Sequence, residues 1–308
     1  MSINRSAYYD YRRGSTYRIT AKKAARASQV KECFALHRRR YGTRRIAAEL
    51  KIGRSAVRSV MRRENLRAIA PKQFKPQTTD SKHGLPVCAN LLQGGANAPT
   101  ANGKVLVGDI TYLSLRGGAF CYLACLQDKF TRRIVGWKVS ERMTAQLVID
   151  VFLQARRRGL VGKGAIIHTD QGSQYAAVEY RRLLYIGGFR QSMSRRGNCY
   201  DNAQAESFFS RVKAELVEDG IFESVEDARS EVFSYIEGYY NRIRLHSGLG
   251  YKSPVEFEKQ LELENKVRSR ESFVCGKAWP SQFYKVYFPV LSSLLSFKLK
   301  WVSENLWK

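Results

Sequence analysis

The chain contains 308 residues, of which 44% are hydrophobic, so it can build a core and is not globally disordered. Its 53 lysines and arginines outnumber 27 acidic residues, and the net charge of +26 predicts a polyanionic partner, with nucleic acid as the first candidate. No uncharged apolar run reaches membrane-spanning length and no secretory signal is recognisable, so we expect a cytoplasmic, nucleoid-associated protein outside the membrane.

The basic charge is concentrated at the front of the chain. Residues 1–80 hold 21 lysines and arginines against 5 acids, whereas residues 101–260 hold 23 against 18. We therefore expect a basic module at residues 1–70 joined to a more balanced domain at residues 104–260. Residues 71–103 are rich in proline, glycine and small polar residues, a composition that breaks helices and strands, and they predict a linker.

The basic module is expected to be helical. Helices are predicted over residues 30–40 and 43–50, and a third runs from the N-cap Ser55 to about Asn65. Helices joined by a glycine-containing turn are typical of the helix-turn-helix that binds DNA. Three arginines at four-residue spacing on the third helix can reach phosphates or base edges in a major groove: Arg54, Arg58 and Arg62. Three further arginines predict sequence-independent phosphate contacts: Arg38, Arg39 and Arg40.

From residue 104 the pattern alternates between strands and helices. Three β-rich stretches, at residues 105–115, 119–128 and 133–140, predict an antiparallel meander. The elements that follow are a helix, a strand, a helix, a strand and a long helix, at residues 144–157, 165–168, 176–185, 189–193 and 203–217. This order predicts an α/β protein with the ribonuclease-H-like fold, a mixed five-stranded sheet flanked by helices.

Three acidic residues fall at informative places in this order. Asp109 lies inside the first strand among aliphatic residues, where an ionised carboxylate is costly without a nearby cation. Asp170 follows the fourth strand at its carboxyl end, and Glu206 lies in the first turns of the long helix, which Asp201 or Asn202 can cap. Converging carboxylates repel one another, and divalent cations relieve that repulsion. The acids therefore predict a two-ion site for in-line phosphoryl displacement.

Four stretches of the chain form recognisable motifs: DITYL at Asp109–Leu113, HTDQGSQY at His168–Tyr175, SMSRRGNCYDNAQAESFFSRVKAEL at Ser192–Leu216 and YYNRIRLHSGLGYKSP at Tyr239–Pro254. Together they resemble the IS-three family of insertion-sequence transposases, and more broadly the integrase core of the retroviral type. The front module also resembles the start of that family's second reading frame. The resemblance covers about residues 6–260.

The resemblance implies a DNA transposase whose acidic triad, Asp109, Asp170 and Glu206, binds two Mg²⁺ ions, for which Mn²⁺ can substitute. It also implies that Lys213, seven residues after Glu206, contacts element DNA. The implied reaction is cleavage of one strand at the element end by water, followed by attack of the freed 3′ hydroxyl on another phosphodiester. The implied partners are double-stranded DNA, both element ends and target, and further copies of the chain in a homo-oligomer.

Two other functions stay open from the sequence: a non-catalytic DNA-binding regulator of its own element, and a ribonuclease-H-like nuclease without strand transfer. No segment here resembles the family's upstream frame, so we expect the chain to be either half of a frameshift fusion with an upstream-frame partner or a short form. The aromatic-rich tail at residues 261–308 has three open roles: packing on the core, joining a partner subunit, or out-of-frame read-through. The six cysteines are scattered, with no Cys-x-x-Cys pair and no close histidine and cysteine cluster, so we expect buried thiols without a structural zinc site.

Overall fold

The computed structural model describes residues 4–14, 20–70, 84–95, 97–195, 203–216 and 221–275. By its internal contacts the chain forms two compact units, residues 1–258 and residues 259–308. Only the helical stretch up to residue 275 is described in the second unit. No helix in these ranges is long and apolar enough to cross a membrane.

The front of the chain is helical, as predicted. The helices are α1 (Arg5–Arg12), α2 (Ala21–Leu36), α3 (Thr43–Glu49) and α4 (Arg54–Arg63). The last three enclose a small core that includes Val30, Ile46 and Val57. One detail of the prediction was wrong: α4 begins at Arg54 after the extended residue Gly53, so Ser55 lies in its first turn and is not the N-cap. Helix α2 also begins earlier than expected, because the Thr20 hydroxyl accepts a hydrogen bond from the Lys23 amide and caps it.

A mixed five-stranded sheet forms the centre of the first unit. Its strands are β1 (Val105–Ser114), β2 (Phe120–Asp128), β3 (Ile134–Ser140), β4 (Ile166–Thr169) and β5 (Arg190–Met193), in the order β3-β2-β1-β4-β5. The first three strands are antiparallel, and β4 and β5 run parallel to β1. Strand β4 pairs with β1 only over Val105–Val107, so the rest of β1 has an open edge on that side.

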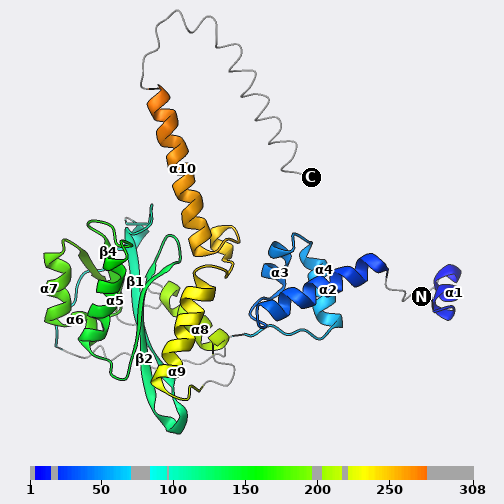
Figure 1. Cartoon of the computed structure of the whole chain (residues 1–308), viewed down its shortest axis with the longest axis horizontal. Helices are drawn as coiled ribbons and strands as arrows, with labels where there is room; N and C mark the ends of the chain where they lie inside the picture. Colours follow the sequence, from blue (N-terminus) through cyan, green and yellow to red (C-terminus); the bar gives the residue numbers. More distant parts are fainter. Residues whose placement is uncertain are drawn as a thin grey trace, which may run out of the picture. The chain divides into compact units, whose positions relative to one another are not determined.

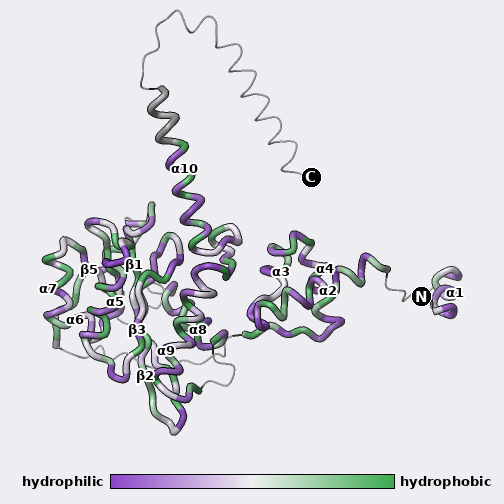
Figure 2. The backbone as a smooth tube through the Cα atoms, in the orientation of Figure 1, coloured by the Kyte–Doolittle hydropathy of each residue, from purple (hydrophilic) through white to green (hydrophobic). Residues whose placement is uncertain are grey.

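Helices cover both faces of the sheet (Figure 1). On one face lie α5 (Ala145–Arg157), α6 (Ser173–Ala176) and α7 (Val178–Ile186), and on the other lie α8 (Ala203–Leu216) and α9 (Val225–Phe233). Hydrophobic and hydrophilic residues alternate along these helices, so that each presents an apolar side to the sheet (Figure 2). The predicted element order and the ribonuclease-H-like fold are thereby confirmed.

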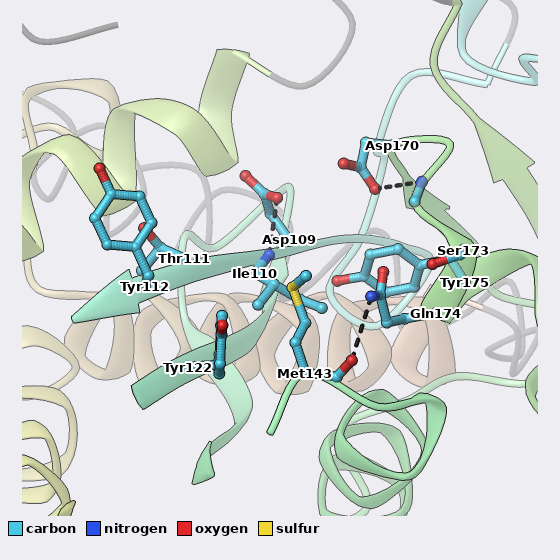
Figure 3. Close-up of a pocket in the computed structure, with 11 residues that line it drawn as sticks. Asp109, Ile110, Thr111, Tyr112, Tyr122, Met143, Asp170, Ser173, Gln174 and Tyr175 are labelled. Carbon is cyan, nitrogen blue, oxygen red and sulfur yellow. Dashed lines mark hydrogen bonds between the residues drawn. The ribbon is translucent and has the colours of Figure 1, made fainter. Parts of the chain in front are cut away.

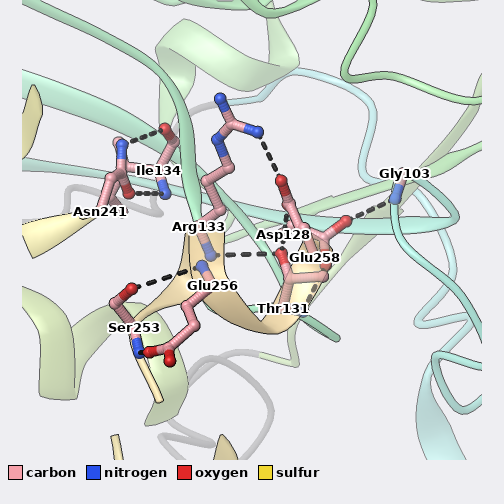
Figure 4. A network of polar contacts seen from close by, with 9 residues as sticks. All are labelled: Gly103, Asp128, Thr131, Arg133, Ile134, Asn241, Ser253, Glu256 and Glu258. Atoms are coloured by element: carbon pink, nitrogen blue, oxygen red, sulfur yellow. Dashed lines mark hydrogen bonds and ion pairs between the residues drawn. The ribbon is translucent and has the colours of Figure 1, made fainter. Parts of the chain in front are cut away.

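The segment after α9 returns to the sheet. A π-helical stretch, Ser234–Tyr240, leads to helix α10 (Pro254–Cys275), whose start is a capping box between Ser253 and Glu256. Figure 4 shows that this start is tied to the turn between β2 and β3. There, Thr131 donates a hydrogen bond to Glu258 over 2.9 Å, and Arg133 forms an ion pair with the same carboxylate. These contacts explain why the helix belongs in part to the first unit.

Candidate active site

A cleft opens where β1 extends beyond the end of β4. Its volume is about 250 Å³, and its lining includes Asp109 and Asp170. Figure 3 shows their carboxylates on the same side of β1, above a floor to which Tyr122 and Met143 contribute. The carboxyl end of a parallel strand next to an open strand edge is where α/β sheets bind ligands. The structure therefore brings two of the three predicted acids together in one cleft.

Asp109 is held in the middle of β1 in a half-buried position. Burial raises the pKa of its carboxyl well above the ordinary value, and the negative charges of Asp170 and Glu206 raise it further. The backbone N–H of Ile110 donates to the carboxylate over 2.8 Å, and the charge of Lys213 also acts in the opposite direction. The charges of Asp170 and Glu206 thus disfavour the ionised form of Asp109.

Asp170 follows β4 directly and begins a tight turn. Its carboxylate accepts a hydrogen bond from the Gly172 amide over 3.0 Å. A side chain at position 172 would meet the Asp170 carboxylate at 3.1 Å, which is why glycine fits here. Just before it, the buried His168 ring lies 2.8 Å from the hydroxyl of Ser192 on β5, a contact that ties the two strands together beside Asp170. His168 therefore has a structural role, which the sequence of its motif did not reveal.

Glu206 stands on the exposed side of α8. The opposite side of this helix packs Phe208, Phe209 and Val212 into the core on the far face of the sheet. Burial raises the pKa of Glu206, and its charge in turn affects Asp109, so the two carboxylates interact. The negative charges of both Asp170 and Glu206 therefore act on Asp109. The residues expected to cap α8, Asp201 and Asn202, lie outside the described residues, as does Cys199.

Lys213 lies farther along α8 and points back toward the cleft. Its ammonium group is 3.8 Å from the centre of the Tyr112 ring on β1, a cation–π contact. Burial lowers the pKa of this lysine, and the negative charge of Asp109 acts against that change. The sequence gave no sign that Lys213 would contact Tyr112.

The arginines of the basic module at residues 1–70, called the helical module below, divide into two groups. Those of α4 are exposed: Arg58 and Arg62 line a shallow depression, while Arg54 donates to the Thr43 hydroxyl over 3.4 Å. Arg38 and Arg39 are also exposed, at the turn after α2. Arg40 differs, because its guanidinium is half-buried against the core and donates to the Glu215 carbonyl over 3.1 Å. The pattern of three successive arginines did not reveal this difference.

The expectation that no histidine lies close to a cysteine was wrong. Cys33, His37 and Glu49 form a close cluster, with potential ligand atoms within 4.8 Å of one another. Cys33 and His37 are one helical turn apart on α2, and Glu49 comes from α3. The His37 ring contacts the Glu49 carboxylate at 2.9 Å, and burial together with the charge of Glu49 raises the pKa of the Cys33 thiol to about 12. The contact between His37 and Glu49 joins the end of α2 to α3.

The described cysteines agree with the expectation of unbridged thiols: Cys33, Cys88, Cys121 and Cys125 are all free. Of the predicted C-terminal tail, residues 276–308 lie outside the described part of the chain.

Comparison with known proteins identifies the family. Residues 99–199 and 187–254 each match a family model described as an integrase core domain. The transposase for insertion sequence element IS904 of Lactococcus lactis is 42% identical over 238 residues, which are 76% of this chain and 93% of the relative. Transposase InsF for insertion sequence IS3A of Escherichia coli is 39% identical over 268 residues, 84% of this chain and 92% of the relative.

A search of solved structures also returned the HTLV-2 integrase catalytic core domain in complex with magnesium, at 14% identity and a TM-score of 0.40 over 52% of this chain and 98% of that chain. The two transposases are far closer in sequence and extend over most of the chain. The chain therefore belongs to the IS3-type family of insertion-sequence transposases, and residues 99–254 contain its integrase core.

Proposed function

We propose that this transposase cuts and joins DNA strands at the ends of an insertion sequence through Asp109, Asp170 and Glu206. The observation that carries the proposal is a cleft at an open strand edge that is lined by Asp109 and Asp170, with the negative charge of Glu206 also acting on Asp109. Water first cleaves one strand at the element end, and the freed 3′ hydroxyl then attacks another phosphodiester. No side-chain nucleophile is needed, because water and DNA supply the attacking oxygens.

The chemistry of these residues fits divalent cations. Carboxylate oxygens are the ligands that Mg²⁺ and Mn²⁺ prefer. Burial and mutual repulsion raise the pKa of Asp109, and a bound cation would offset both effects. Two Mg²⁺ ions held by Asp109, Asp170 and Glu206 would supply charge that activates an attacking oxygen and stabilises a leaving oxygen. The three carboxylates are carried by β1, by the turn after β4 and by α8.

The rest of the molecule supports DNA as the substrate. Lys213, held over Tyr112 beside the acids, is proposed to contact element DNA, because its ammonium group lies near the cleft. The exposed arginines of the helical module are proposed to contact the duplex: Arg54, Arg58, Arg62, Arg38 and Arg39. A reaction that joins two ends and a target requires more than one active site, so we propose that copies of the chain assemble on DNA. We also propose that a protein from the upstream frame joins this assembly.

Mg²⁺ is expected to stabilise the folded chain. A ligand at one hundred times its Kd adds about 2.7 kcal/mol, and thermal unfolding with increasing Mg²⁺ at constant ionic strength measures this gain. Because the folded pKa of Asp109 is raised, its favourable contribution is present at low pH and is lost as the pH rises through that raised value. Asp109→Asn should therefore remove both the Mg²⁺ response and this pH dependence. An equal response to Mg²⁺ in the variant would contradict the assignment.

Arg58→Ala is expected to weaken binding to all duplexes by a similar factor if this exposed side chain contacts a phosphate. Each lost phosphate contact reduces the slope of log K against log salt by about one. Fluorescence anisotropy with terminal-repeat and random duplexes over a salt series measures affinity and slope together. Loss confined to the terminal repeat would instead assign Arg58 to base recognition.

Cleavage of a labelled duplex that carries the element's terminal repeat tests the proposed function directly. With the full chain and Mg²⁺, we expect nicks at the 3′ end of the element and joined products. Nicks without joined products would favour a nuclease. Binding without nicks, also in the presence of an upstream-frame protein, would favour a regulator of the element.

A further inference from the structure

The helical module docks on the core through a set of polar contacts around the turn that joins α2 and α3. The buried Tyr41 hydroxyl donates to the Ile243 carbonyl over 3.3 Å and accepts from the Leu245 amide over 2.8 Å. Arg45 donates to the Leu245 carbonyl over 2.7 Å, and the His37 ring lies 3.3 Å from the Tyr239 hydroxyl. The contacted residues belong to the motif at Tyr239–Pro254, to which the proposed reaction assigns no role.

Arg40 extends this contact to α8. Its side chain donates to the backbone carbonyl of Glu215 over 3.1 Å, in the last turn of that helix. Carbonyls at a helix C-terminus lack partners within the helix and attract positive charge. The guanidinium is further fixed over two aromatic rings, with its central carbon 4.6 Å from the Tyr239 ring and 5.3 Å from that of Tyr235.

The Glu215 side chain is held from the other direction. Arg244 donates to its carboxylate through two nitrogens, at 2.8 and 2.5 Å, and Tyr235 donates over 2.9 Å. The side chains of Arg244 and Glu215 are only 1% and 5% exposed. Because a buried charge tolerates few other arrangements, this pair fixes the end of α8 in one position.

Helix α8 carries residues of the proposed active site. Lys213 precedes Glu215 by two residues, and Glu206 precedes it by nine. A helix is a stiff rod with a rise of about 1.5 Å per residue, so a shift at its last turn moves both side chains relative to β1. We propose that Arg40 is a positioning residue, through which docking of the helical module on the core sets where α8 presents Glu206 and Lys213. The inference rests on the proposed function.

A comparison of Arg40→Met with Gln29→Ala tests this inference in the full chain. Methionine keeps the aliphatic stem of Arg40 but removes its charge and donors. We expect Arg40→Met to lower the cleavage rate at saturating terminal-repeat duplex about tenfold, with the Kd for DNA within about twofold of the wild type. Arg40→Lys should recover most of the rate. Gln29→Ala, at an exposed site on α2 that has no proposed part in DNA binding, should leave both the Kd for DNA and the saturated rate unchanged.

Hydrogen exchange of the amides in α8, measured without DNA or metal, separates this inference from the proposed function. Arg40→Met should speed exchange in the last turn, residues 212–216, whereas Gln29→Ala should not. A wild-type chain that fails to cleave would count against the proposed function and leave this readout intact. The positioning role would be overturned by unchanged exchange in Arg40→Met, or by loss of affinity with an unchanged saturated rate.

Discussion

Replacing Glu206 by glutamine is expected to abolish strand cleavage while leaving DNA binding nearly intact. Glutamine has almost the same size but removes the negative charge that a divalent cation requires. Such ions contribute several kcal/mol to the stabilisation of the transition state, and each 1.4 kcal/mol corresponds to a tenfold change in rate, so we expect a loss of at least about a thousandfold. The exposed position of Glu206 means that the substitution should not disturb the fold.

A gel assay with an end-labelled terminal-repeat duplex measures this loss, and anisotropy measures binding of the same DNA. Glu226→Gln is the matched control, because Glu226 is an exposed glutamate in the first turn of another helix, α9. The control should cleave at the wild-type rate. Equal loss of binding and cleavage in Glu206→Gln would show that the residue supports folding or DNA contact, and residual cleavage near the wild-type rate would remove it from the active site.

Replacing Arg244 by methionine is expected to destabilise the protein by about 3–5 kcal/mol, because it leaves the buried carboxylate of Glu215 without its partner. The ion pair now holds the pKa of Glu215 below its ordinary value, in opposition to burial. Without Arg244, burial would dominate and the carboxyl would take up a proton more readily. The double variant Arg244→Met with Glu215→Leu should recover part of the loss, since no unpaired charge then remains.

Denaturant unfolding followed by circular dichroism gives the change in the free energy of unfolding. Arg116→Met is the control, because Arg116 and Glu223 form an ion pair whose side chains are 74% and 58% exposed. Solvent screens such pairs, and their loss costs at most about 1 kcal/mol. Similar effects of Arg244→Met and Arg116→Met would contradict the importance of the buried pair.

Much of the central fold could be predicted because its signals are local. Strands of β-branched and aromatic residues between glycines and charges gave the order of β1 to β5, and the apolar stripe of α5 predicted its packed face. Helix starts were less certain, since several nearby residues can act as caps. Ser55 is a good N-cap by residue type, yet Gly53 adopts the extended conformation before α4.

The sequence by itself determined the type of fold, the family and the order of the three acids, because these depend on residue type, spacing and the periodicity of hydrophobic residues. Only the tertiary structure decided which charges meet. Arg38 and Arg40 are alike in sequence, but one is exposed and the other packs against Glu215, 175 residues away in the chain. Contacts such as Arg244 with Glu215 and Lys213 with Tyr112 form where elements distant in sequence pack together. The spacing of residues along the chain does not predict which distant elements will pack.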